Sequence, residues 1–170
     1  TEQTVDVFLE SAYFNPTWVR KTARRHGLST DSSFRFERGI DPNGTIYALK
    51  EAALLVQELA GGTISSEIKD NSPAPIADFT VELNYEKVHS LIGKTIPVET
   101  IKSIVTSLEM KIVNETPGGL TLQVPPYRVD VQRDCDVVED ILRIYGYNNV
   151  EIPTTLKSSL TTKGEVDYSH

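Results

Sequence analysis

The chain has 170 residues, 39% of them hydrophobic and 24% charged, and a formal net charge of −7. This composition indicates a soluble globular protein of one or two domains and excludes a disordered chain. The acidic balance argues against a protein that coats nucleic acid non-specifically. No apolar run approaches the ~20 residues of a membrane span, and we expect no signal peptide, because residues 1–14 contain acids and lack a basic start. The single cysteine, Cys135, excludes an internal disulfide and a cysteine-built zinc site, so we expect a cytoplasmic protein.

The chain begins with an expected strand and helix. Residues 4–14 alternate loosely and are rich in β-branched and aromatic side chains, which favours a strand. Because the chain starts there without Met, we expect a piece excised from a longer protein. Asn15 and Pro16 then predict the start of a helix, and Gly27 predicts its end.

The rest of the first part is expected to hold one more helix and one more strand. Residues 28–41 show no regular pattern and are expected to be irregular. Asp41 and Pro42 predict the start of a second, stronger helix, which Gly61 ends. Residues 63–69 are then expected to form a strand.

A complete small unit is predicted beyond residues 71–77, which are the best candidate linker because they hold two prolines and no pattern. The predicted elements of this unit are a strand over 79–83, helices over 84–93, 97–108 and 134–145, and a β-hairpin over 111–124. Three helices and a β-hairpin match the element order of winged-helix domains. The expected fold class is therefore α+β.

Two groups of side chains in the first part are candidate sites. Arg20, Lys21, Arg24 and Arg25 share one face of the first helix and could follow a phosphate backbone, although a solvated helix surface is the more ordinary interpretation. Glu10 and the polar loop at residues 30–33 could grip a small polar ligand or orient a water. The same loop residues also commonly make local turn hydrogen bonds, and this local role is favoured from the residues alone.

Acidic residues gather on the last predicted helix. Asp136, Glu139 and Asp140 lie at i, i+3 and i+4 and so share one face, and Asp130 precedes them. Acids in a first helical turn are favoured by the helix dipole. Like charges at i and i+4 repel by a few tenths of a kcal/mol, however, and a hard cation such as Mg²⁺ would offset this. A plain solvated face and a docking surface for a basic partner are the alternatives.

Several strings of the sequence are specific to one family. Residues 9–16 (LESAYFNP), 21–33 (KTARRHGLSTDSS) and 35–42 (RFERGIDP) resemble the beta chain of phenylalanyl-tRNA synthetase, bacterial type. So do residues 124–131 (VPPYRVDV) and 136–147 (DVVEDILRIYGY). The resemblance covers nearly the whole chain in order.

The resemblance implies a division into three parts. Residues 1–75 would be the C-terminal part of the tRNA-editing domain, which hydrolyses tyrosine wrongly attached to the phenylalanine tRNA. Residues 76–154 would be the fifth beta-chain domain, a winged-helix-like module. Residues 155–170 would begin the catalytic-like, inactive synthetase domain.

The resemblance also assigns site residues. Glu10 matches the glutamate that recognises the phenolic hydroxyl of tyrosine, and Thr30 and Ser32 match the loop that shapes the editing pocket. The family usually has alanine at position 32. Four acids match the positions that hold Mg²⁺ shared with the alpha chain, where the family usually has glutamate at position 140: Asp130, Asp136, Glu139 and Asp140.

The implied partners are the alpha subunit, in an α2β2 tetramer, and tRNA(Phe), with no membrane. ATP would be bound by the whole enzyme through its alpha chain and not by this fragment, which would be inactive alone. Two alternatives are a stand-alone winged-helix module that binds nucleic acid and a structural spacer. Residues 76–170 hold 9 basic and 14 acidic side chains, a net charge of −5, which counts against nucleic-acid binding.

Overall fold

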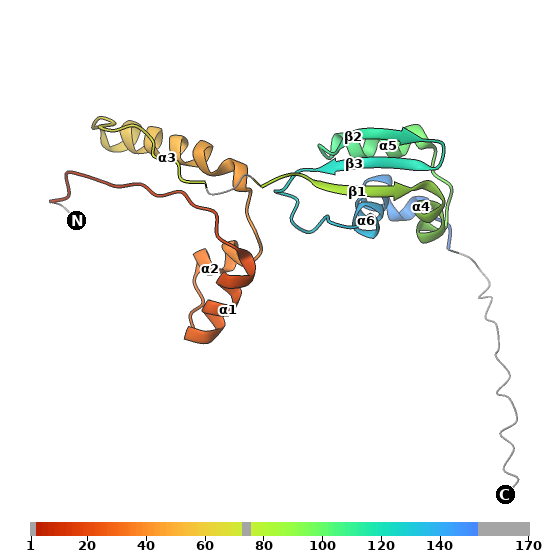
Figure 1. The fold of residues 1–170 in the computed structure, drawn as a ribbon, viewed down its shortest axis with the longest axis horizontal. Helices are drawn as coiled ribbons and strands as arrows, with labels where there is room; N and C mark the ends of the chain where they lie inside the picture. The colour runs from red at the N-terminus through yellow and green to blue at the C-terminus, as the bar shows by residue number, and fades with distance from the viewer. Residues whose placement is uncertain (1–2, 73–75, 153–170) are drawn as a thin grey trace, which may run out of the picture.

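The computed structural model describes residues 3–72 and 76–152, and the described chain forms two units (Figure 1). The first unit holds the helices α1 (Pro16–His26), α2 (Asp31–Phe36) and α3 (Thr45–Ala60), with a 3-10 turn, η1 (Pro42–Gly44), before α3. The second unit holds three strands, three helices and a 3-10 turn: β1 (Phe79–Asn84), α4 (Tyr85–Ile92), α5 (Val98–Ser107), β2 (Lys111–Thr116), β3 (Gly119–Val124), α6 (Asp134–Tyr145) and η2 (Tyr147–Asn149). The α+β class is confirmed.

Helix α1 begins and ends where its sequence predicts. The Oδ1 atom of Asn15 accepts hydrogen bonds from the backbone N–H groups of Thr17 at 3.0 Å and Trp18 at 3.2 Å. Gly27 ends the helix in the left-handed conformation, at φ +62°. Capping of this kind supplies partners for backbone groups that a helix leaves unpaired at its ends.

Helix α2 corrects the expectation that residues 28–41 are irregular. Thr30 Oγ1 accepts from the N–H of Ser33 at 3.1 Å, and Thr30 N–H donates to Ser33 Oγ at 2.9 Å. This reciprocal pair is a capping box, and it starts a helix of only 6 residues. So short a helix has no room for a periodic apolar stripe, so its sequence carries no helical pattern.

The two strands expected in the first unit are also wrong. Residues 4–14 and 63–69 lack regular structure, and Val5 and Phe8 are 91% and 93% exposed. A strand needs a hydrogen-bonded neighbour, and no strand pairs with either segment within the described residues. Helix α3 ends at Gly61 as predicted, but it is preceded by η1, where Asp41 Oδ1 accepts from the N–H of Asn43 at 2.9 Å.

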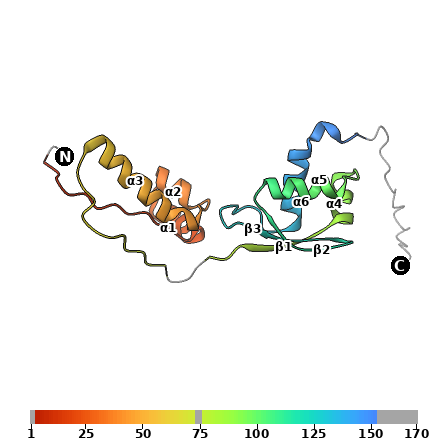
Figure 2. The same cartoon turned by 90° about the horizontal axis from the view of Figure 1, so that it is seen from above.

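The second unit is a three-stranded antiparallel sheet with helices on one face (Figure 2). The strand order is β1-β3-β2, so β3 is central, and Val81 of β1 lies opposite Leu122 of β3. β2 and β3 form the predicted hairpin, with an irregularity in register between Ile112 and Asn114. α4, α5 and α6 confirm the three predicted helices.

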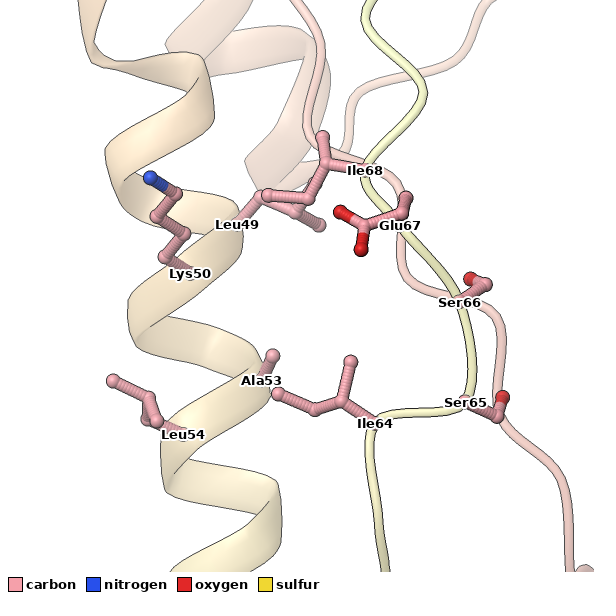
Figure 3. A pocket seen from close by; sticks show the side chains of 9 residues that line it. All are labelled: Leu49, Lys50, Ala53, Leu54, Ile64, Ser65, Ser66, Glu67 and Ile68. Carbon is pink, nitrogen blue, oxygen red and sulfur yellow. The ribbon is translucent and has the colours of Figure 1, made fainter.

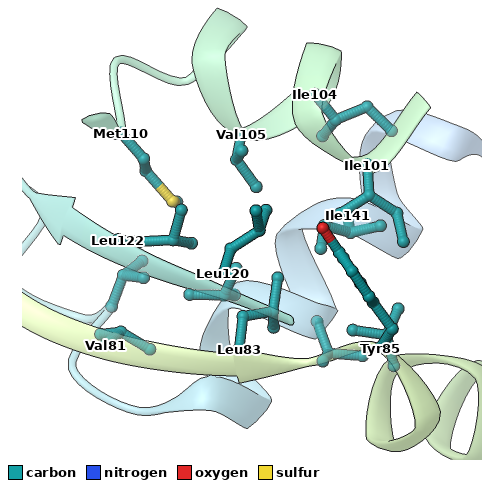
Figure 4. Packing of buried hydrophobic residues seen from close by; sticks show 14 of the residues in the cluster. Val81, Leu83, Tyr85, Ile101, Ile104, Val105, Met110, Leu120, Leu122 and Ile141 are labelled. Carbon is teal, nitrogen blue, oxygen red and sulfur yellow. The ribbon is translucent and has the colours of Figure 1, made fainter. Parts of the chain in front are cut away.

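The hydrophobic core of the described residues lies in this second unit, between the sheet and its helices (Figure 4). Leu122, Val124 and Ile141 have no exposed surface. No hydrophobic residue between residues 3 and 72 is buried, and several large apolar side chains on α3 are exposed. No helix in residues 3–72 or 76–152 combines the length and apolar character that a membrane crossing requires.

The expected linker falls partly outside the description. Residues 73–75 lie outside the described residues, while 71–72 and 76–77 on either side have no regular structure and are exposed. The expected third part, residues 155–170, lies wholly outside the described residues.

Candidate functional site

The three residues predicted for the editing pocket lie on exposed parts of the first unit. Glu10 is exposed in the irregular segment before α1, and Ser32 is exposed in the first turn of α2. The Thr30 hydroxyl already caps α2 through Ser33. None of the hydrogen bonds formed by the described residues joins Glu10 to Thr30 or Ser32. The assignment of these three residues to a pocket therefore stays a prediction.

Helix α2 and the residues that follow it nevertheless contact α1 and the segment before α1. The rings of Phe14 and Phe36 meet edge to face, with centroids 4.9 Å apart, so the segment that carries Glu10 ends against α2. Arg20 of α1 donates from Nη2 to the carbonyl of Glu37 at 3.2 Å. The Arg38 guanidinium lies 3.4 Å from the centre of the Phe34 ring.

The basic face of α1 has no acidic partner among the described residues. Arg20, Lys21, Arg24 and Arg25 are all exposed, and no acidic side chain forms an ion pair with them in the described part of the chain. Lys21 lies 5.4 Å from the centre of the Trp18 ring, which is itself exposed. This surface could accept an anion, although a solvated helix face is the more ordinary interpretation.

A groove of about 620 Å³ lies between α3 and residues 64–68 (Figure 3). Leu49, Ala53, Ile64 and Ile68 give it apolar walls, and Lys50 and Glu67 stand at its edge. It contains none of the predicted site residues. The groove forms where residues 64–68 lie only loosely against α3, so that Leu54 and Ile64 stay 53% and 62% exposed.

The acidic face of α6 is paired with arginines. Asp136 Oδ1 accepts from Arg133 Nη2 at 3.0 Å, and its Oδ2 accepts from the backbone N–H of Arg133 at 2.9 Å. The hydrogen bond from the Arg133 side chain is the main cause that lowers the pKa of Asp136 to about 2, and backbone N–H groups add to it. Asp136 thus takes part in the capping box at the start of α6.

The other acids of this face have separate arginine partners. Asp140 accepts from Arg128 Nη2 at 2.6 Å, in a pair whose side chains are mostly buried. Glu139 accepts from Arg143 Nη2 at 2.5 Å on the exposed side of α6. The guanidinium groups therefore offset the repulsion that the spacing of Asp136 and Asp140 predicts.

The described residues do not converge on one metal ion. Asp130 is exposed, and no group of three or more His, Cys, Asp or Glu side chains in residues 3–72 and 76–152 is arranged to hold a metal. A Mg²⁺ ion needs oxygen ligands around a single centre, whereas three of the four predicted acids each face a different arginine. The present arrangement does not fit the ion, so the predicted Mg²⁺ site stays a prediction.

The loop between β3 and α6 forms contacts that were not predicted from the sequence. Tyr127 donates its phenolic hydrogen to the carboxylate of Glu109, a residue that adopts a positive φ of 63° after α5. Arg128 also donates from Nη1 to the carbonyl of Leu108 at 3.4 Å. The only sequence signal for these contacts is the string of residues 124–131, which places Tyr127, Arg128 and Asp130 among prolines and valines.

Comparisons with known proteins divide along the two units. The sequence matches the family described as B3/4 domain over residues 1–61 and the family described as tRNA synthetase B5 domain over residues 81–147. The phenylalanine–tRNA ligase beta subunit of Bacteroides fragilis is 82% identical over 170 residues, all of this chain and 21% of that protein. The whole chain therefore matches part of a phenylalanine–tRNA ligase beta subunit.

Two further beta subunits show the same extent of match. That of Bacteroides thetaiotaomicron is 82% identical over 170 residues, which is all of this chain and 21% of that protein. That of Porphyromonas gingivalis is 53% identical over 167 residues, 98% of this chain and 20% of that protein. The chain thus spans about a fifth of the length of the beta subunits that it matches, with its B3/4 match before its B5 match.

Proposed function

We propose that this chain works within a phenylalanine–tRNA ligase, which attaches phenylalanine to tRNA(Phe) at the expense of ATP. The observation that carries the proposal is identity of 82% over all 170 residues to proteins named as its beta subunit. ATP and phenylalanine would be bound through an alpha subunit in an α2β2 assembly in the cytoplasm. The part described here would contribute to editing and to the arrangement of tRNA and the alpha subunit.

The editing role follows from a limit on selectivity. A synthesis site built for phenylalanine has difficulty rejecting tyrosine, which adds only a hydroxyl, so a second site that selects for that hydroxyl is needed. A carboxylate such as that of Glu10 can accept the phenolic hydrogen, and a hydrogen bond to a charged group contributes about 1.5–3 kcal/mol. The contact of Phe14 with Phe36, which sets the Glu10 segment against the helix that Thr30 caps, supports a common pocket.

The function is tested in the complete two-chain enzyme with Glu10→Gln, which keeps the side-chain size and removes the charge. We expect hydrolysis of tyrosine-charged tRNA(Phe) to fall about 10- to 100-fold, from the hydrogen-bond energy above. Charging of tRNA with phenylalanine should stay unchanged. Glu86→Gln is the matched control, because Glu86 is exposed on α4 in the second unit. Unchanged hydrolysis in Glu10→Gln would remove Glu10 from the editing pocket.

Magnesium stays in the proposal only as an implication of the family resemblance. The acids Asp130, Asp136, Glu139 and Asp140 would need ligands from the alpha subunit, or release of their arginines, to surround one ion. Calorimetric titration of Mg²⁺ into the metal-stripped two-chain enzyme tests this, with Asp136→Asn beside the native enzyme. Equal binding by both would exclude Asp136 as a ligand.

A nucleic-acid-binding role for the second unit on its own is less well supported. The third helix of a winged-helix domain is the one that would enter a groove, and α6 carries four acids against one arginine between Asp134 and Tyr145. Measuring the affinity of the second unit for a nucleic-acid duplex at several salt concentrations tests this role, because phosphate contacts make the affinity fall steeply as the salt concentration rises. A pure spacer between neighbouring domains would instead lose editing, without loss of tRNA binding, when the linker at 71–77 is altered.

A further inference from the structure

The two units touch at Gly39 and Val129. Gly39 lies between α2 and η1 of the first unit and has a φ of +89°. A Cβ atom at this position would lie 2.7 Å from Cγ1 of Val129, 3.2 Å from its Cβ and 3.3 Å from its Cγ2. Val129 belongs to the second unit, in the loop between β3 and α6. Only glycine lets the backbone of the first unit approach this side chain so closely.

The Val129 side of this contact is fixed to the core of the second unit. Its neighbours on the loop, Tyr127 and Arg128, bond to Glu109 and to Asp140, as described above. The carbonyl of Val129 accepts from Gln132 Nε2 at 2.9 Å. Val131, two residues on, is 2% exposed and packs in the core cluster. Val129 therefore lies in a loop whose residues before and after it are fixed to the second unit.

The Gly39 side is fixed in the same way to the first unit. The N–H of Gly39 donates to the carbonyl of Phe36 at 3.2 Å, which ties it to the end of α2. The Arg38 side chain donates to the carbonyl of Phe34 at 2.9 Å, and Arg20 of α1 bonds the carbonyl of Glu37. The turn that carries Gly39 thus connects to both α1 and α2.

A second pair of residues brings the same two segments together. The pKa of Tyr127 is raised, chiefly by its hydrogen bond to Glu109 and by burial, and the negative charge of Asp41 in the first unit adds to the rise. Asp41 follows Gly39 by two residues, and Tyr127 precedes Val129 by two. The approach of the two segments therefore extends beyond a single pair of atoms. In both overall views the loop after β3 points toward the start of α3 (Figures 1 and 2).

We infer that the contact of Gly39 with Val129 is a joint that sets the orientation of the first unit relative to the second. One covalent connection joins the two units, and one point of attachment does not by itself fix their relative orientation. A non-covalent contact at a second place restricts that orientation. The role of the joint in catalysis rests on the proposed function: it would place the editing unit relative to the unit beside the alpha subunit.

The first test uses hydrogen exchange on the complete two-chain enzyme with Val129→Ala. Removing two methyl groups from the second unit should make the amides of residues 35–42, in the first unit, exchange several-fold faster. Val113→Ala is the matched control, because Val113 is 51% exposed on β2 and the same deletion is made away from the joint. Faster exchange confined to residues 125–131, with 35–42 unchanged, would overturn the inference.

The second test changes Gly39, the residue that the first unit contributes to the contact. Gly39→Ala introduces a Cβ against Val129 and also strain from the positive φ, so faster exchange is expected across the joint at residues 125–131. Gly62→Ala separates the two effects, since Gly62 has a φ of +99° but nothing within 4 Å of an added Cβ. An equal response at 125–131 in both variants would show that no joint exists.

These readouts do not depend on catalysis. If exchange responds as expected while Glu10→Gln leaves tyrosine editing intact, the joint stands and the editing role of Glu10 falls. If Glu10→Gln abolishes editing while neither joint variant changes exchange across the units, the editing role of Glu10 stands and the joint falls. Where both are right, Val129→Ala also lowers hydrolysis of tyrosine-charged tRNA(Phe) more than it lowers charging with phenylalanine.

Discussion

Arg128 and Asp140 form an ion pair of 2.6 Å between the loop after β3 and helix α6, and their side chains are only 18% and 13% exposed. The Nε atom of Arg128 is buried and has no hydrogen-bond partner within the described residues. The guanidinium therefore depends on Asp140 and on the carbonyl of Leu108 for its partners. Asp140 thus forms a structural ion pair, although its spacing on α6 made it a candidate metal ligand.

Substitution of Asp140 by asparagine should destabilise the second unit. Loss of the charge leaves a mostly buried guanidinium without its counter-charge, which costs several kcal/mol in a fully buried pair and about 2 kcal/mol in this partly exposed one. Urea unfolding of the 170-residue chain, followed by circular dichroism, measures the loss. Glu139→Gln is the control, because its pair with Arg143 is 61% and 60% exposed and contributes about 0.5 kcal/mol or less. Equal losses in the two variants would contradict this ranking.

Asp136 should make stability fall in acid. The pKa of Asp136 in the folded chain is lowered from 3.8 to about 2, first of all by the hydrogen bond from the Arg133 side chain. A lowered folded pKa means that the carboxylate stabilises the fold above about pH 4, and that this stabilisation is lost as the pH falls toward 2. The difference in unfolding free energy between native chain and Asp136→Asn should therefore be full near neutral pH and shrink below pH ~4.

The control for this titration is Asp6→Asn, because Asp6 is exposed in the irregular segment before α1. It should leave the unfolding free energy unchanged at every pH. A difference between native chain and Asp136→Asn that persists unchanged at pH ~2 would show that charge on Asp136 is not its cause.

Leu122 should be among the most costly residues to truncate. It is fully buried on the central strand β3, opposite Val81, and faces the helices (Figure 4). Leu122→Ala is expected to lower the free energy of unfolding by about 3 kcal/mol, through lost apolar burial and the cavity left behind. Leu91→Ala, at a position 55% exposed on α4, should cost under ~1 kcal/mol in the same urea experiment. Similar costs would mean that the core is not where the structure puts it.

The second unit could be predicted from its sequence because its signals are local and complete. Asn84 caps α4 through the N–H of Lys87 at 3.0 Å, and Gly93 ends it at φ +79°. The apolar stripes of α5 and α6 face a sheet that is present in the same stretch of chain. Each local preference therefore agrees with the packing, and the predicted elements were confirmed.

The first unit was predicted less well, because strands are defined by partners and not by propensity. Val5 and Phe8 have the composition of a strand, yet they are almost fully exposed and no described strand lies beside them. The arginine partners of Asp136 and Asp140 were missed for a related reason. Arg128 reaches Asp140 only once the loop folds over α6, a contact that spacing along one helix does not reveal.

Thr30 offers a way to separate capping from a direct role in editing. Thr30→Val removes the hydroxyl that accepts from Ser33, which costs about 1 kcal/mol at a helix N-cap, so the amides of α2 should exchange faster. Thr30→Asp restores a capping oxygen without restoring the hydroxyl, and we expect it to return α2 to its native protection. Editing by the two-chain enzyme is then compared across both variants. Recovery of editing in Thr30→Asp would mean that Thr30 acts through α2, and continued loss would mean that its hydroxyl contacts the misacylated tRNA.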